Sequence, residues 1–457
     1  MTFSSIVFIF LFLPLFFVFY FMFKKRKTRN LMMLIFSLLF YGYGEPIYVF
    51  LMILSIVINY YFAILIDKKH SKKYLVLALI YNLGLLFIFK YSNFFLSNIN
   101  NILNLSIPFL KITLPIGISF YTFQIITYIV DVYKRKVPVQ KNIVNLGCYI
   151  SAFPQLIAGP IVRYSDISDE IINRKENLSD FYDGVKRFII GLAKKVIIAN
   201  EMAYIADTIF TGDLVSVGFI GVLLAAICYP LQVYFDFSGY SDMAIGYGKM
   251  LGFHYLENFN YPFMADSITD FWKRWHISLS SFFRDYVYIP LGGNRCSRLR
   301  NIINILIVWL LTGLWHGANW NYILWGLYFG IFIILEKFVF NKILEKTPKF
   351  LKHIITLFVL CISFIVFYFN DFSLLFEALK SLFGGNGFGN IYWLYNYQIL
   401  KARTIIIFII GLLSSTPLLK RLYKDSLLID IILIILFLIS ISFILVSSYN
   451  PFIYFRF

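Results

Sequence analysis

Long apolar stretches recur along the chain, and they constrain its fold more than any other feature. About nine of them approach the roughly 20 residues that a helix needs to cross a hydrocarbon core of about 30 Å, among them residues 5–23, 47–66 and 428–446. Of the 457 residues, 60% are hydrophobic and 14% are charged, which is typical of membrane proteins. The sequence therefore predicts an all-α membrane protein, a polytopic helical bundle of about 10 to 12 spans forming one domain over residues 1–457.

Basic residues mark the ends of these stretches and predict how the chain crosses the membrane. Clusters at residues 24–29, 68–73 and 134–136 follow the first, third and fifth apolar runs, and short cytoplasmic loops carry an excess of Lys and Arg. The first run precedes its charges, which is the opposite of a cleavable signal peptide. We therefore expect a multi-pass protein of the cell membrane with its N-terminus outside. The net charge of +17 lies largely in such loops, so it predicts no nucleic-acid partner.

Two Trp-His pairs, Trp275-His276 and Trp315-His316, lie in strongly apolar surroundings. An ionisable side chain at membrane depth is costly and usually marks a functional site. Histidine also exchanges a proton near neutral pH. The alternative for each histidine is a buried imidazole satisfied by backbone carbonyls, and the residues alone leave both interpretations open.

The second pair lies at the apex of an expected hairpin. Basic residues around 295–300 and 337–352 place both ends of the hairpin in the cytosol. Its arms, residues 301–315 and 322–335, would be only about 21 to 23 Å long as helices. We therefore expect short re-entrant or broken helices whose apex lies inside the membrane and lines a central funnel open to the outside. His316 would lie near the floor of this funnel and His276 closer to the cytosol.

Residues 232–326 carry several motifs that resemble the membrane-bound O-acyltransferase family, in particular its alginate and peptidoglycan O-acetyltransferase branch. The motifs are YFDFSGYSD at 234–242, ENFNYP at 257–262, DFWKRWHISLS at 270–280, FRDY at 283–286, PLGGNR at 290–295 and WHG at 315–317. Within the first motif we also expect a helix break near Ser238 and Gly239, where Asp236 and Asp242 could order the break or line the tunnel, and ordering is the preferred interpretation.

The resemblance implies an O-acyltransferase with the fold of that family. His316 of the Trp-His-Gly motif would be the catalytic residue, and His276 the second catalytic polar group. The donor would be cytosolic acetyl-coenzyme A, acting as a substrate rather than a bound cofactor, and the acceptor a cell-surface or secreted polysaccharide, alginate-like or peptidoglycan. An extracytoplasmic esterase-like partner of the SGNH type would complete the transfer. A neutral imidazole suits this chemistry, because attack by a hydroxyl on a thioester needs a base.

Other residues are candidates for binding the substrates or relaying the acyl group. Lys273, Arg274 and Arg284 could hold the phosphates of the donor, although positive-inside topology explains them equally well, and Asp270 is placed to pair with Arg274 at i, i+4. Trp315 and Asn319 at the apex are further candidates. In the C-terminal tail, Tyr454 could accept the acyl group transiently, or the aromatic tail could be an interfacial anchor.

The sequence predicts neither a metal site nor a covalent triad. Its four cysteines, Cys148, Cys228, Cys296 and Cys361, form no CxxC pair or ligand-like cluster, and no Gly-x-Ser-x-Gly elbow is present. Three other functions stay open: D-alanyl transfer to teichoic acid by the same fold, a transporter of glycan or anion, and a scaffold that recruits a soluble acetylase.

Overall fold

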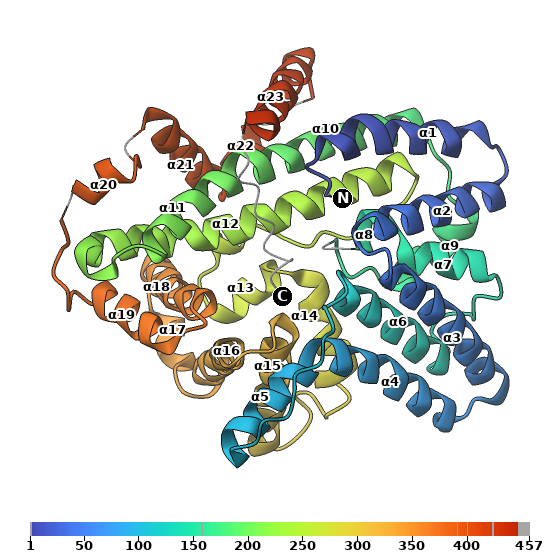
Figure 1. Cartoon of the computed structure of the whole chain (residues 1–457), viewed down its shortest axis with the longest axis horizontal. Helices are drawn as coiled ribbons and strands as arrows, with labels where there is room; N and C mark the ends of the chain where they lie inside the picture. Colours follow the sequence, from blue (N-terminus) through green and yellow to red (C-terminus); the bar gives the residue numbers. More distant parts are fainter. Residues whose placement is uncertain (1, 157–158, 391, 400, 423–424, 447–457) are drawn as a thin grey trace. The chain divides into compact units, whose positions relative to one another are not determined.

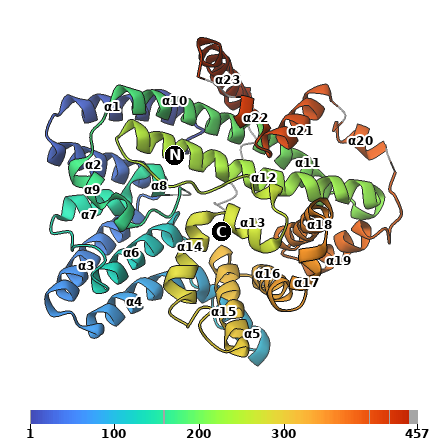
Figure 2. The same cartoon turned by 180° about the vertical axis from the view of Figure 1, so that it is seen from behind.

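The computed structural model describes residues 2–156, 159–390, 392–399, 401–422 and 425–446, which excludes the predicted relay residue Tyr454. The described residues form helices joined by loops and contain no strand (Figures 1 and 2). The predicted all-α architecture is therefore confirmed. The chain divides into two compact units, residues 1–189 with 240–257 and residues 190–239 with 258–457, and each is described by itself.

Unit 1 is built around α6, whose residues are nearly all buried. Its interior is apolar and aromatic, while the outer faces of the surrounding helices expose large hydrophobic side chains, as expected for contact with lipid. Its helices are η1 (Phe8–Phe12), α1 (Leu13–Met22), α2 (Arg26–Gly44), α3 (Tyr48–Lys69), α4 (Lys72–Leu86), η2 (Phe87–Tyr91), α5 (Ser92–Leu103), α6 (Ile118–Tyr133), α7 (Ile143–Ser151), α8 (Phe153–Leu156), α9 (Tyr164–Asn173), the larger part of α10 (Leu178–Ala193) and the last part of α12 (Leu214–Met250).

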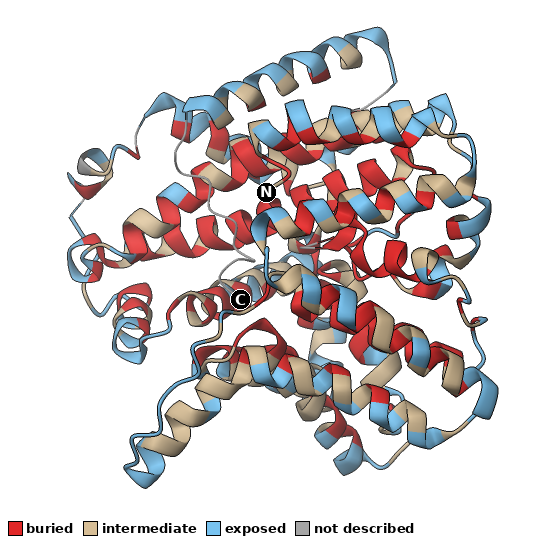
Figure 3. Cartoon of the chain, turned by 45° about the vertical axis from the view of Figure 1, so that its right-hand side comes forward, coloured by how far each residue is buried: buried red, intermediate tan, exposed pale blue. Residues whose placement is uncertain are grey.

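Unit 2 contains both Trp-His pairs and most of the family-like motifs. Its helices are η3 (Lys194–Ala199), α11 (Asn200–Phe210), the first part of α12 (Leu214–Met250), η4 (Pro262–Met264), α13 (Ile268–Arg274), α14 (Ile277–Phe283), η5 (Arg284–Tyr288), α15 (Arg298–His316), α16 (Trp320–Phe338), α17 (Asn341–Lys346), α18 (Lys349–Tyr368), α19 (Phe372–Leu382), α20 (Tyr392–Asn396), α21 (Ala402–Ser414), α22 (Leu418–Leu422) and α23 (Leu427–Val446). Many helices in the described part of the chain are buried along one face and exposed along another (Figure 3).

Seven helices in the described part of the chain are long and apolar enough to cross a membrane, judged by length and composition. They are Tyr48–Lys69, Lys72–Leu103, Leu214–Met250, Arg298–His316, Trp320–Phe338, Lys349–Tyr368 and Leu427–Val446. Two shorter apolar helices, Phe8–Met22 and Ala402–Ser414, accompany them. The described residues thus contain fewer full-length spans than the ten to twelve expected, and two apolar runs fold as shorter helices.

The hairpin of α15 and α16 is longer than the sequence predicted. Each helix has 19 residues, or about 28 Å, because Ser297 caps α15 before Arg298 and Asn319 caps α16 before Trp320. The prediction that both arms are too short to cross was therefore wrong. Glycines let the two helices approach closely: a Cβ on Gly313 would lie 2.3 Å from the carbonyl oxygen of Tyr322.

Helix α12 is continuous where a break was predicted. Residues 219–250 are helical without interruption, and the non-helical residue is Gly218, with φ of 56°. A Cβ on Gly239 would lie 2.7 Å from the carbonyl oxygen of Gly191, so this glycine serves close helix packing rather than a bend. Asp242 does order its surroundings in unit 1, where its Oδ1 lies 2.9 Å from Nη2 of Arg187.

Candidate functional site

His276 lies at the junction between α13 and α14, where the backbone reverses direction. It is the N-cap residue of α14 and has φ of 45° and ψ of 55°, the left-handed region that non-glycine residues rarely adopt. Two backbone hydrogen bonds hold the junction: Ile277 N donates to Asn258 O at 3.0 Å, and Asn260 N donates to Arg274 O at 2.9 Å. The segment beginning at Asn258 thus compensates for the strained backbone of His276.

The imidazole of His276 is completely buried. Its Nδ1 lies 3.3 Å from Oδ1 of Asn258, and the same oxygen accepts hydrogen bonds from the backbone N of Ser278 at 3.1 Å and from its hydroxyl at 2.9 Å. Phe237 of α12 packs edge-on against the ring at 4.6 Å between centroids. Both the position and the orientation of this histidine are therefore determined by its neighbours.

His316 is the last residue of α15 and is 5% exposed. Three aromatic rings pack edge-on around its imidazole, at centroid distances of 4.9 Å for Trp315, 4.8 Å for Trp325 and 5.4 Å for Phe367. The following Gly317 has an extended backbone, but a Cβ there would lie 2.2 Å from the Tyr322 ring. A glycine must therefore follow His316 if Tyr322 is to keep its place.

Trp315 brings the two histidines together. Its ring lies 5.6 Å from that of His276 and 4.9 Å from that of His316, between centroids. Burial lowers the pKa of His276 well below its usual range, and the charge of a protonated His316 lowers it further. Both effects favour a neutral imidazole at physiological pH. The two histidines thus form one buried pair around Trp315, and their predicted difference in membrane depth stays a prediction.

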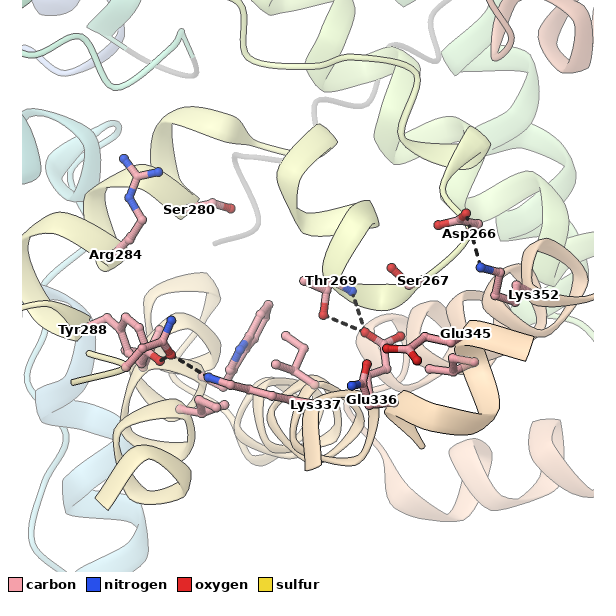
Figure 4. Close-up of a pocket in the computed structure, with 17 residues that line it drawn as sticks. Asp266, Ser267, Thr269, Ser280, Arg284, Tyr288, Glu336, Lys337, Glu345 and Lys352 are labelled. Atoms are coloured by element: carbon pink, nitrogen blue, oxygen red, sulfur yellow. Dashed lines mark hydrogen bonds and ion pairs between the residues drawn. The ribbon is translucent and has the colours of Figure 1, made fainter. Parts of the chain in front are cut away.

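A cavity of about 690 Å³ lies in the same unit (Figure 4). It carries three basic and three acidic side chains beside apolar and hydroxyl groups. Its lining comprises Asp266, Ser267, Thr269, Ser280, Arg284, Tyr288, Asn294, Ile305, Val308, Trp309, Ile333, Glu336, Lys337, Asn341, Leu344, Glu345 and Lys352. One of the acids has a structural task, since the carboxylate of Glu336 accepts hydrogen bonds from the backbone N of Ile268 at 2.6 Å and of Thr269 at 2.9 Å.

A continuous series of indole rings leads from this cavity to His316. Trp309 lines the cavity and packs against Trp272 at 4.6 Å between centroids. Trp272 contacts Trp325 at 5.7 Å, and Trp325 contacts His316 at 4.8 Å. The region between the charged cavity and the catalytic candidate is therefore filled by packed aromatic rings.

The residues predicted to bind the phosphates of the donor do not all line the cavity. Arg284 lines the cavity, whereas Lys273 and Arg274 are outside its lining. The predicted pair is confirmed, because Nε of Arg274 lies 2.8 Å from Oδ2 of Asp270. The Asn319 side chain accepts a hydrogen bond from the backbone N of Trp320 at 2.7 Å and so caps α16.

Sequence reasoning missed three contacts of the site. Asn258 belongs to the ENFNYP motif, which was recognised without assigning its members a task. Trp325 and Phe367 come from α16 and α18 and look like ordinary core residues of spans. Only their packing against His316 distinguishes them.

The profile of the membrane-bound O-acyltransferase family matches residues 132–377, more than half of the chain and both histidines. This chain belongs to the membrane-bound O-acyltransferase family. It is accordingly an acyltransferase and a multi-pass membrane protein, as its motifs predicted.

Similar members of the family are named for several acyl transfers. The chain is 40% identical over 369 residues to a probable alginate O-acetylase of Pseudomonas aeruginosa, covering 78% of this chain and 69% of that protein. It is 36% identical to a peptidoglycan O-acetyltransferase of Helicobacter pylori, covering 78% and 74%. A teichoic acid D-alanyltransferase of Bacillus subtilis is 32% identical, covering 55% of this chain and 68% of that protein.

Proposed function

We propose that this acyltransferase moves an acetyl group from cytosolic acetyl-coenzyme A across the cell membrane for O-acetylation of a cell-surface or secreted polysaccharide. The observation that carries the proposal is the similarity to the alginate and peptidoglycan enzymes, which extends over 78% of this chain in both cases. The two buried histidines, which contact the same indole ring, can supply the base that acyl transfer to a hydroxyl requires.

In the proposed reaction His316 is the base. The acceptor hydroxyl attacks the thioester carbonyl while an imidazole nitrogen of His316 takes its proton, the new C–O bond forms, the C–S bond breaks, and the thiolate then recovers the proton. A positioned base contributes roughly 10² to 10⁴-fold to the rate, or about 3 to 5 kcal/mol. The position of His316 supports this role, because it ends α15 among three aromatic rings and is almost completely shielded from water.

The cavity is the proposed entry for the donor. Arg284, Lys337 and Lys352 in its lining suit the phosphates of coenzyme A, and positive-inside topology places the nearby basic residues in the cytosol. The indoles of Trp309, Trp272 and Trp325 would guide the pantetheine arm toward His316.

On the outer side, the proposal includes an SGNH-type partner that completes transfer to the sugar hydroxyl, with the N-terminus of this chain outside. Tyr454 is the proposed transient acyl carrier. Normal transfer by a Tyr454→Phe variant would exclude the carrier role without affecting the rest of the proposal.

D-alanyl transfer to teichoic acid is the second candidate function, because the similarity to the Bacillus subtilis enzyme covers 55% of this chain. The two candidates differ in their donor. Turnover of acetyl-coenzyme A by the purified protein supports acetyl transfer, whereas D-alanine transfer from a thioester on a carrier protein, without acetyl-coenzyme A turnover, supports the alternative.

Base-released acetate is the decisive measurement. It is compared in peptidoglycan and extracellular polysaccharide from cells with the wild type, a deletion, and His316→Ala at matched protein levels. Loss of acetate in both mutants is expected and identifies the acceptor fraction. If cells with His316→Ala released as much acetate as the wild type while the deletion released none, the protein would be a scaffold or transporter.

A further inference from the structure

The amide of Asn258 has a defined orientation beside His276. Its oxygen faces the backbone N of Ser278 at 3.1 Å, and a backbone N–H can only donate. Flipping the amide would place its NH₂ group against this donor. Asn258 Oδ1 is therefore an acceptor for the groups around it, independently of how the hydrogens are placed.

This orientation determines the tautomer of His276. Nδ1 of the imidazole lies 3.3 Å from the same Oδ1, and two lone pairs facing each other in a buried site would repel. Nδ1 must therefore carry the hydrogen. In a neutral imidazole the other nitrogen, Nε2, then carries the lone pair.

Nε2 of His276 is a buried acceptor that the described residues leave without a hydrogen-bond partner. It lies on the side of the ring away from Asn258. Phe237 and Trp315, the aromatic neighbours of the ring, carry no charge. The ionisable group whose charge acts on His276 is His316. Both histidines contact the ring of Trp315, so this lone pair belongs to the same buried cluster as the residue that becomes positively charged during proton transfer.

We infer that Asn258 is a positioning residue for acyl transfer: it holds His276 as the Nδ1–H tautomer, so that Nε2 of His276 stabilises the positive charge that His316 acquires when it takes the hydroxyl proton. The inference rests on the proposed function, in which His316 is the base. His276 gives up no proton in this scheme. The hydroxyl proton moves to His316 and then to the departing thiolate, and His276 stays neutral throughout.

The physical need for such an acceptor follows from burial. An imidazolium formed among aromatic rings has lost the stabilisation of water. A neutral acceptor with a fixed orientation replaces part of that stabilisation and requires no reorganisation when the proton moves. A His276 that was itself protonated would do the opposite, because two adjacent cations repel.

Asn258→Asp tests the inference through the pH dependence of the rate. The new carboxylate still accepts from Ser278 and His276, but its charge favours the protonated form of His276. Opposite charges in contact move a pKa by about 1 to 3 units. The acidic limb of the kcat/KM profile for acetyl-coenzyme A should therefore move by about that amount to higher pH. An unmoved limb in an active Asn258→Asp protein would overturn the inference.

Asn304→Asp is the matched control. Asn304 is completely buried in the same unit, and its side chain donates to Leu291 O at 3.1 Å rather than contacting a histidine. A carboxylate there is likewise a buried charge and also loses the hydrogen bond to Leu291 O, but no histidine in the described part of the chain contacts Asn304, so the pH limb should stay at the wild-type position. If the acidic limb of the kcat/KM profile moved equally in Asn258→Asp and Asn304→Asp, the shift would have a general structural cause. This result would also contradict the inference.

A second comparison uses His276→Gln and His276→Leu, two side chains that do not titrate. The amide oxygen of Gln can act as an acceptor, whereas Leu cannot. With acetyl-coenzyme A, kcat should be at least about 10-fold higher for Gln than for Leu, the factor expected for a hydrogen bond to a charged group, with similar KM. Equal kcat values would contradict the acceptor role. A wild-type protein without acyl-coenzyme A turnover would instead reject the proposed function.

Discussion

Nζ of Lys195 lies 2.8 Å from Oδ1 of Asp236, and the two side chains are 3% and 2% exposed. The pair joins η3 to α12, and its Asp236 immediately precedes Phe237, the residue whose ring packs against His276. A buried ion pair requires both partners, because a single charge left in an apolar interior is strongly unfavourable. The structural role of this pair is therefore to hold the helix that supports the histidine.

Removing one partner of this pair should destabilise the protein severely. Asp236→Asn or Lys195→Met should lower the free energy of unfolding by about 3 to 5 kcal/mol, measured by thermal denaturation in detergent. Lys380→Met is the control, because Lys380 and Glu377 form an exposed pair with Nζ and Oε1 at 3.6 Å, worth about 0 to 1 kcal/mol. Similar effects of both changes would contradict this interpretation.

The aromatic rings around His316 should limit the size of the acyl group. Phe367→Ala opens space beside His316, so kcat/KM for propionyl-coenzyme A relative to acetyl-coenzyme A should rise about 10-fold or more, the effect of one methylene in an apolar pocket. Phe364→Ala is the control, since Phe364 is buried on the same helix but contacts Trp275 and Tyr229. An unchanged ratio in an active Phe367→Ala enzyme would mean that Phe367 does not limit acyl size.

Gly317→Ala should abolish most activity for a steric reason. Its backbone is extended, which any residue tolerates, but the added methyl would lie 2.2 Å from the Tyr322 ring. Truncating that ring in the double variant Gly317→Ala with Tyr322→Ala should recover activity relative to Gly317→Ala alone, as measured by acetyl-coenzyme A turnover. Gly84→Ala in α4 is the control, because a Cβ there meets nothing within 4 Å. If the activity losses of Gly317→Ala and Tyr322→Ala were additive in the double variant, a clash between the added methyl and the Tyr322 ring would not explain the loss.

Stability should fall as the pH drops below about 6.5, the ordinary pKa of histidine. The pKa of His276 in the folded protein is well below that value, so in this range the unfolded chain binds a proton that the folded protein does not. The stabilisation is complete above about pH 6.5 and is lost by about 1.4 kcal/mol per pH unit below it.

Thermal denaturation of the wild type and of His276→Gln between pH 7.5 and 5.5 measures this contribution. The midpoint should fall less steeply with pH in His276→Gln. Parallel curves for the two proteins would show that His276 does not contribute to the pH dependence.

The hydropathy pattern predicted the helical fold class correctly, but it placed the ends of some helices wrongly. The hairpin arms were measured from their apolar residues, whereas helix hydrogen bonding continues through Arg298 because Ser297 caps that end. The expected break at Gly239 failed for a related reason: a glycine in a helix often permits close packing, and only the position of Gly191 shows that this is its use here.

The amino-acid sequence by itself determined that the chain is a helical membrane protein of the O-acyltransferase family, and it singled out His276 and His316. Periodicity and composition act locally, and motif residues can be recognised one by one. Only the tertiary structure decided that both histidines contact Trp315 and that Asn258 orients His276. Those relationships depend on the packing of segments distant in sequence, and neither hydropathy nor spacing along the chain contains that information.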